Sequence, residues 1–424
     1  MRPMTSISSS NLCYLICDTL KLLNPKPIEH GTRMAYMLIK MLEERGGCEE
    51  YEIAEYAFLT MLHDIGAYKT DNVDAPDYES EEGIAHCVYG SLFLKTLSPF
   101  GERCDILLYH HMPFSKMGRI NYRYLDIASY ICFLEDVDAL IMSDPDPDFS
   151  ILEAFSKTKY RSESIVLFNK CIKRYDILNK IKTGEYENEV KAYFDENVLF
   201  KNEEKDCLMH LIAHLLSFRE QARSIMTIMS LCICDELADA MDLSLAEKDK
   251  LSYAALVRDV GMMRVATPIK KPRLKMEDDE RRAFESHVEL SEKLLRKYMR
   301  DQTIVDIAIA HHERLNGRGY PYHLKKRDMS VSQCILQIAD LLARYMNRYK
   351  EKEEDIMDEK TITSILNKRA YDKELDDELV QWVGMKYGRI EERLRLEVKE
   401  YMETHANINT KYKFLMKSKI GEKL

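Results

Sequence analysis

Glycine and proline are scarce in this sequence, with 15 Gly and 11 Pro among 424 residues. These two residues interrupt helices and form most tight turns. Their scarcity, together with abundant Leu, Met, Ala, Lys and Glu, therefore predicts an all-α fold. A chain of this length accommodates two or three domains, each large enough to bury its own core.

The sequence also lacks a disulfide framework and a long apolar run. Its cysteines are odd in number, eleven, and include no Cys-x-x-Cys pair, so reduced, buried thiols are expected. The apolar stretch 12–23 is interrupted by Asp18 and Lys21. It is too broken for a signal peptide and too short for a membrane span. We therefore expect a cytoplasmic protein that does not enter a membrane.

Positive charge is not in excess. The net charge is −10 and no large basic block is present, which argues against binding of long nucleic acid. A small phosphorylated molecule needs only a local cationic pocket, so such a partner fits this composition. A homodimer is also compatible with the sequence.

Three short motifs occur twice in the same order. The segment FLTMLHDIG at 58–66 aligns with YAALVRDVG at 253–261, at an offset of 195 residues. A single histidine and a histidine pair follow in both halves, 24 residues apart and at an offset of 201: His86 with His110-His111, and His287 with His311-His312. Two unrelated helical domains could share a histidine pair by coincidence, but hardly this order and spacing. We therefore predict two tandem copies of one helical domain.

The boundary between the two copies is placed at Lys201–Asp206, which gives domains 1–200 and 201–424. Gly66 and Gly261 are each expected to close a helix. The polar segments 68–80 and 262–277 are predicted loops, and the DPDPD stretch at 144–148 should break the first copy. Residues 372–406 are predicted to form a long charged helix, followed by a lysine-rich tail.

The first copy contains six side chains that could hold metal: His30, His63, Asp64, His86, His110 and His111. Imidazole and carboxylate donors suit divalent Fe, Mn, Ni or Zn. A lone histidine is more often an ordinary helix residue, which is our interpretation of His210, His214, His323 and His405, but the ordered set of six is different. No cysteine accompanies these histidines in a zinc-finger spacing, so a structural zinc is disfavoured. The set predicts two divalent metal ions bridged by catalytic Asp64, an arrangement that hydrolyses phosphate esters.

These motifs resemble the HD-GYP branch of the HD phosphohydrolase superfamily. The first copy has His30-Gly-Thr-Arg33, His63-Asp-Ile-Gly66, His86-x-x-x-Gly90 and His110-His111. The second copy carries the other signature of the branch, which runs from His311-His312 to Gly319-Tyr320-Pro321, and ends on Ile338-Ala-Asp340. The resemblance implies all-α domains, two or three metal ions, often iron or manganese, and hydrolysis of cyclic di-GMP or a related cyclic dinucleotide.

The first copy departs from the family pattern. Ser129 stands where the last Asp ligand is expected, and the interval from His111 to Ser129 is ten residues shorter than that from His312 to Asp340, so the GYP loop is missing. The family usually has Lys directly after the HDIG motif. Ala67 takes that place here, and we expect Lys69 to contact a substrate phosphate instead. Lys116 and Arg119, in the short stretch that replaces the loop, are further candidates for substrate binding.

The second copy departs in the complementary way. Arg258 replaces the histidine of the HD pair, and no histidine lies between His214 and His287. The remaining residues form a degenerate site: Asp259, His287, His311, His312, Asp340, Gly319, Tyr320 and Pro321. We expect Arg258 to pair with Asp259 or Asp340 in place of a metal.

Two functions are therefore considered. The first is a metal-dependent phosphodiesterase whose chemistry takes place in the first copy, with cyclic di-GMP or a related nucleotide as substrate. The second is a catalytically degenerate module that binds a nucleotide or serves as a signalling adaptor. Metal content of the purified protein distinguishes the two.

Overall fold

The computed structural model describes residues 6–70, 81–265, 276–351 and 359–418, except for the side chains of 81–83 and 348–351. Within these ranges the regular structure is helical, and strand-like pairing is limited to two isolated bridges. The predicted all-α fold is confirmed. No helix in the described ranges combines the length and the apolar character needed to cross a membrane.

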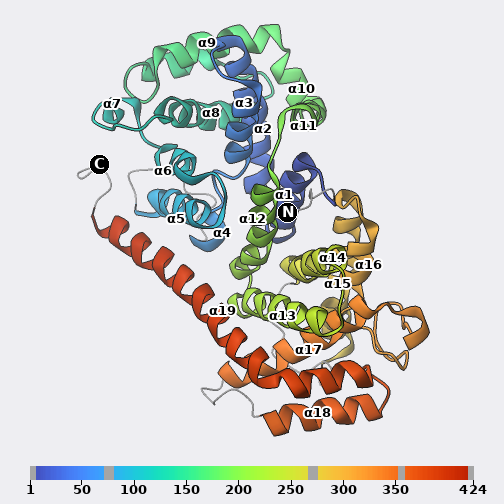
Figure 1. The fold of residues 1–424 in the computed structure, drawn as a ribbon. Coiled ribbons are helices and arrows are strands. Elements are labelled where there is room, and N and C mark those ends of the chain that lie inside the picture. Colours follow the sequence, from blue (N-terminus) through green and yellow to red (C-terminus); the bar gives the residue numbers. More distant parts are fainter. Residues whose placement is uncertain (1–5, 71–80, 266–275, 352–358, 419–424) are drawn as a thin grey trace. The chain divides into compact units, whose positions relative to one another are not determined.

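The chain forms two compact units (Figure 1). The N-terminal unit comprises Ser9–Lys205 together with the chain from His405 onwards. The C-terminal unit comprises Asp206–Thr404 together with the residues up to Ser8. The predicted division into 1–200 and 201–424 did not include this exchange of terminal segments. The helix that begins at Asn202 also runs through the expected boundary stretch.

The N-terminal unit is organised around helix α2 (Lys26–Arg45). This helix packs against α3 (Glu50–Met61), α8 (Leu125–Ser143), α9 (Ser162–Arg174) and α11 (Glu185–Asn197). Apolar residues at helical spacing along α2 are buried in the core, as expected for a central helix. The other helices are α1 (Ser9–Leu23), α4 (Ala67–Thr70), α5 (Glu81–Leu97), α6 (Asp105–Tyr109), α7 (Phe114–Met117) and α10 (Ile177–Thr183), with 3-10 helices at Gly101–Cys104 and Phe149–Phe155.

The C-terminal unit is organised around helix α13 (Gln221–Ala240). This helix packs along α17 (Val331–Glu351) and against α14 (Leu245–Val257). Helices α15 (Asp278–Tyr298) and α16 (Gln302–Ile309) pack on each other. The other helices are α12 (Asn202–Leu215), α18 (Glu359–Tyr371) and α19 (Asp377–Lys417), with 3-10 helices at Leu216–Phe218, Val260–Arg264 and Lys326–Asp328.

Corresponding helices pack in corresponding pairs in the two units. The pairs α2–α3, α2–α8, α5–α6 and α6–α8 of the N-terminal unit have counterparts in α13–α14, α13–α17, α15–α16 and α16–α17 of the C-terminal unit. These are the pairings that two copies of one domain would have. They bring the HD motif, the single histidine and the histidine pair to equivalent positions in each unit.

The predicted boundaries of helices and loops are partly wrong. The long helix begins at Asp377 rather than near 372, and it continues through most of the lysine-rich tail to Lys417. The predicted break at 144–148 is confirmed, because α8 ends at Ser143. Residues 71–80 and 266–275 of the two predicted loops lie outside the described residues, whereas 67–70 and 260–264 are short helices.

The helix-closing role of Gly66 and Gly261 was also wrong. Helix α3 already ends at Met61, with Leu62 as its cap. A Cβ atom on Gly66 would lie 2.0 Å from the carbonyl oxygen of His86, and one on Gly261 would lie 2.0 Å from that of His287. Glycine is needed because two backbones touch, and this contact holds the turn after the HD motif against the helix that carries the single histidine.

Replacement of Gly66 by Ala should destabilise the N-terminal unit. The added methyl group overlaps a backbone carbonyl that cannot move without α5, so the free energy of unfolding should fall by at least about 1–3 kcal/mol. Thermal and urea unfolding followed by circular dichroism measure the change. Gly118→Ala is the matched control, because a Cβ atom there meets nothing within 4 Å. Equal stability of the two variants would contradict the role assigned to Gly66.

Candidate metal centre

The six predicted ligands of the N-terminal unit come together at one place. His30 lies in α2, His63 and Asp64 lie in the turn after α3, and His86 lies in α5. His110 and His111 directly follow α6. His63, His86 and His110 are buried, although imidazoles are polar. Buried polar side chains need partners, so their convergence requires an explanation beyond packing.

The carboxylate of Asp64 is at the centre of three imidazoles. One of its oxygens lies 3.3 Å from Nε2 of His63, and the other lies 3.2 Å from Nε2 of His86 and 3.7 Å from Nε2 of His110. Nε2 of His86 and Nε2 of His110 are 3.3 Å apart. Because these nitrogens face one another across the carboxylate, one small cation could contact several of them together.

The imidazoles of His63 and His110 are held in the tautomer that metal binding requires. Nδ1 of His63 donates to the carbonyl of Thr60 at 2.7 Å, and Nδ1 of His110 donates to the carbonyl of Leu107 at 2.6 Å. With the proton on Nδ1, the lone pair of Nε2 points into the site, as is common for metal-bound histidines. Nε2 of His63 faces carboxylate oxygens of Asp64, at 3.3 Å, and Glu135, at 2.9 Å.

Two carboxylates that sequence reasoning missed complete the other side of the site. Glu135 in α8 lies 3.0 Å from Nε2 of His30 and 2.9 Å from Nε2 of His63. Asp138, one turn later, accepts hydrogen bonds at 2.7 Å from Nδ1 of His30 and from Arg33. Asp138 therefore orients His30, while Glu135 brings a second carboxylate among the imidazoles.

Glu135 supplies the acidic group that Ser129 cannot. Ser129 is buried in the same helix, and its hydroxyl is without a hydrogen-bond partner in the described part of the chain. The signal for Glu135 was present in the sequence, because Glu135, Asp136 and Asp138 interrupt an otherwise apolar helix. Since Glu135 is six residues beyond the expected position, comparison with the family motif alone did not identify it.

Opposite charges dominate the protonation of this site. Burial alone would lower the pKa of His30, but Glu135 and Asp138 raise it to about 9. Burial would also lower the pKa of His63, but Asp64 and Glu135 raise it well above its usual value. Burial lowers the pKa of His86 to about 4 and that of His111 well below its usual value. His86 and His111 are therefore neutral at pH 7, the form that binds metal.

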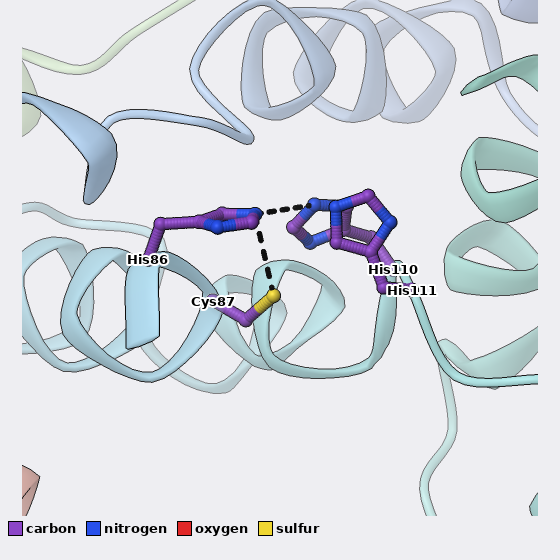
Figure 2. Close-up of side chains that lie close together, drawn as sticks. All are labelled: His86, Cys87, His110 and His111. Atoms are coloured by element: carbon purple, nitrogen blue, oxygen red, sulfur yellow. Dashed lines mark hydrogen bonds between the residues drawn. The ribbon is translucent and has the colours of Figure 1, made fainter. Parts of the chain in front are cut away.

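The donor set fits divalent metal ions. Donor atoms within 4.8 Å of one another form three overlapping groups: His30, His63 and Glu135; His63, Asp64 and His110; and His86, Cys87, His110 and His111 (Figure 2). Imidazole and carboxylate donors at this spacing suit Fe, Mn, Ni or Zn. Cys87 was not among the ligands predicted from the sequence.

The predicted substrate-binding cations lie on exposed positions of the same unit. Lys69 is in α4, which follows the HDIG turn. Lys116 is in α7, and Arg119 follows that helix by two residues. Their role in substrate binding remains a prediction.

In the C-terminal unit, a guanidinium group lies where the N-terminal unit has an imidazole. Arg258 is fully buried, and its Nη2 lies 3.5 Å from Asp259 and 3.4 Å from Asp340. The predicted pairing of Arg258 is confirmed. A second guanidinium group, that of Arg344, lies 2.6 Å from Asp340 and 3.3 Å from Nδ1 of His312. Both acidic groups of the degenerate site are thus compensated by arginine.

The three histidines of the C-terminal unit still converge. Nε2 of His287 and Nε2 of His311 are 3.4 Å apart, and each lies within 3.7 Å of Asp259. Together with His312 they form a group that could hold a metal ion. At the offset of 195 residues that aligns the HD motifs, however, the position of His30 is taken by Ile225. At the offset that aligns Ser129 with Asp340, the position of Glu135 is taken by Met346. One side of the centre is therefore apolar here.

The GYP loop is anchored beside this site. The buried carboxylate of Glu313 accepts hydrogen bonds from the backbone N–H groups of Tyr322, at 2.6 Å, and Leu324, at 2.9 Å. The ring of Tyr320 lies 4.8 Å from that of His312. Gly319 and Pro321 flank this tyrosine, so the predicted loop residues and the histidine pair lie together.

Comparisons with known proteins agree with this arrangement. Residues 207–379 match the HD domain family. The 3'3'-cGAMP-specific phosphodiesterase 1 of Vibrio cholerae is 24% identical over 349 residues, which cover 77% of this chain and 80% of that protein. The 3'3'-cGAMP-specific phosphodiesterase 3 of the same organism is 33% identical over 107 residues, 25% of this chain and 23% of that protein. The resemblance to the HD-GYP branch of the HD superfamily is thus confirmed.

A solved structure has a similar fold. The crystal structure of a cyclic GMP-AMP specific phosphodiesterase from V. cholerae has a TM-score of 0.54 and 16% identity, and the match covers 89% of this chain and 97% of that one. At this level of identity the likeness concerns the fold. The HD domain match at 207–379 falls on the half that carries Arg258.

Replacement of Glu135 by Gln should weaken metal binding. The variant keeps the shape of the side chain but removes the negative charge beside His30 and His63, so metal affinity should fall about 10–100-fold. Titration of the metal-depleted full chain with Mn²⁺ or Zn²⁺ measures this affinity. Asp136→Asn is the control, because Asp136 pairs with Lys159 instead. Unchanged affinity in Glu135→Gln would show that this carboxylate is not part of the centre.

Replacement of Arg258 by His should not create a metal-dependent enzyme in the C-terminal unit. Ile225 and Met346 would still stand at the positions of His30 and Glu135, so two of the donors present in the N-terminal unit remain missing. Metal analysis and turnover are compared with those of the unaltered chain. A gain of bound metal together with turnover that survives Asp64→Asn would contradict this expectation.

Proposed function

We propose that this chain is a metal-dependent phosphodiesterase that hydrolyses a cyclic dinucleotide in its N-terminal unit. The observation that carries the proposal is the ring of imidazole Nε2 atoms around Asp64, with Glu135 as a second carboxylate. The names of the relatives support the reaction and the class of substrate. Both 3'3'-cGAMP and cyclic di-GMP belong to that class.

The proposed centre contains two divalent ions. Such ions supply hydroxide from water and stabilise the charge that develops on the phosphoryl oxygens. The chain's own residues hold the centre in place: Thr60 and Leu107 fix the tautomers of His63 and His110 through their carbonyls. Asp138 fixes the ring of His30. Asp64 lies between His63 on one side and His86 and His110 on the other, so its carboxylate would help to hold both ions.

The location of the chemistry rests on the difference between the units. Asp64 is surrounded by imidazoles, which can exchange a proton for a metal ion. Asp259 is paired with Arg258, whose charge is permanent. A fixed cation beside the carboxylate opposes entry of a second cation. This difference supports the N-terminal unit as the site of hydrolysis.

The second candidate function is a binding module. The paired Arg258 and Asp340, together with the anchored GYP loop, favour a C-terminal unit that holds a ligand without hydrolysing it. If the N-terminal centre is also inactive, the whole chain is an adaptor rather than an enzyme.

The activity test uses the full chain with 3'3'-cGAMP and cyclic di-GMP in the presence of Mn²⁺, Fe²⁺, Ni²⁺ or Mg²⁺. Linear dinucleotide products are separated by chromatography. Asp64→Asn should lower turnover by about 100-fold or more, the scale of losing a principal catalytic group. Asp259→Asn, checked for folding by circular dichroism, should retain turnover.

The opposite pattern in these two variants would assign the chemistry to the C-terminal unit. Absence of turnover with every metal, combined with measurable dinucleotide binding, would favour the binding module. The two candidate functions are therefore separated by one set of proteins.

A further inference from the structure

Cys87 is adjacent to His86 in α5, and its sulfur points into the centre. Sγ of Cys87 lies 3.4 Å from Nε2 of His86, which in turn lies 3.3 Å from Nε2 of His110. Figure 2 shows His86 and Cys87 reaching from α5 toward the rings of His110 and His111. Donor atoms of all four residues lie within 4.8 Å of one another.

These separations match a shared metal ion. A tetrahedral ion with metal–nitrogen bonds of about 2.0–2.1 Å and metal–sulfur bonds of about 2.3 Å places neighbouring donors about 3.3–3.7 Å apart. The distance between the two nitrogens and that between nitrogen and sulfur both fall in this range. An S–H···N hydrogen bond alone would account for the pair Cys87–His86 but not for the approach of His110.

The sulfur is specific to the N-terminal unit. At the offset of 201 residues that aligns His86 with His287, the counterpart of Cys87 is Val288, which is fully buried. His287, His311 and His312 form the equivalent group without sulfur. A buried apolar residue thus fills this position in the other unit, so packing alone does not require a thiol.

We propose that Cys87 is a thiolate ligand of the metal centre and that it directs the centre toward softer divalent ions, Zn²⁺, Fe²⁺ or Co²⁺, over Mn²⁺ and Mg²⁺. Thiolate donors select such ions, whereas carboxylate and water suit Mn²⁺ and Mg²⁺. The thiol proton is released to solvent when the metal–sulfur bond forms. The proposal rests on the metal-dependent function proposed above and adds the ligand that sets its metal preference.

The test is Co²⁺ binding to the metal-depleted full chain, followed by absorption spectroscopy. A cobalt–thiolate bond gives an intense near-ultraviolet charge-transfer band, which nitrogen and oxygen ligands do not give. The unaltered chain should show this band, and Cys87→Ser should lose it. Cys87→Val provides a second variant, because valine occupies the equivalent buried position. Cys104→Ser, at another buried cysteine of the same unit, should retain the band.

Metal preference gives an independent measurement. The ratio of Zn²⁺ affinity to Mn²⁺ affinity should fall about 10–100-fold in Cys87→Ser, while Cys104→Ser leaves it unchanged. Co²⁺ bound to the unaltered chain without a charge-transfer band would overturn the role of Cys87 but would not contradict the proposed metal centre. Failure of the chain to bind Co²⁺, Zn²⁺ or Mn²⁺ would overturn the metal centre itself.

Discussion

A carboxylate enclosed at the end of a helix needs a compensating positive charge, and the rest of each functional site follows from how that charge is supplied. Asp64 and Asp259 occupy equivalent turns, and leaving either unpaired in the interior would be costly. In the N-terminal unit the compensation comes from titratable imidazoles, which can release their proton and bind a metal ion instead. In the C-terminal unit it comes from Arg258, which cannot lose its charge. Arg258 in place of the HD histidine thus turns an exchangeable site into a permanent ion pair, and Ile225 and Met346 remove two further donors.

Contacts between helices hold the aspartates and histidines of each site in fixed positions. Gly66 and Gly261 let the turn after the HD motif touch the backbone of the helix that carries the single histidine. The carbonyl groups of the preceding helical turns then fix the ring orientation in both units, as His110 and His311 show. Because main-chain atoms make these contacts, the geometry survives in the C-terminal unit although its metal-binding side chains have changed.

The sequence predicted the helical fold and a candidate site because both depend on spacing along the chain. His30, His63, Asp64, His86 and the pair His110-His111 follow a fixed order, and the structure brings them together. The order of motifs could not reveal Glu135 or Cys87. Whether Glu135 reaches the site depends on the rotation of α8 against α2, and the direction of Cys87 depends on how α5 packs on α6. The role of the two glycines was missed for the same reason, since close backbone approach is a property of packing.

Helix α19 begins in one unit and ends in the other. Its last turns belong to the N-terminal unit, where Tyr412 packs on Tyr89 and His405 packs near Phe93, both on the helix that carries His86. During synthesis, the N-terminal unit therefore leaves the ribosome without part of its own core and acquires it only after residues 405–412 have been made. Expression of residues 1–200 alone would leave α5 with an uncovered aromatic face, so the unit with the candidate metal centre depends for its packing on residues that follow the other unit in the sequence.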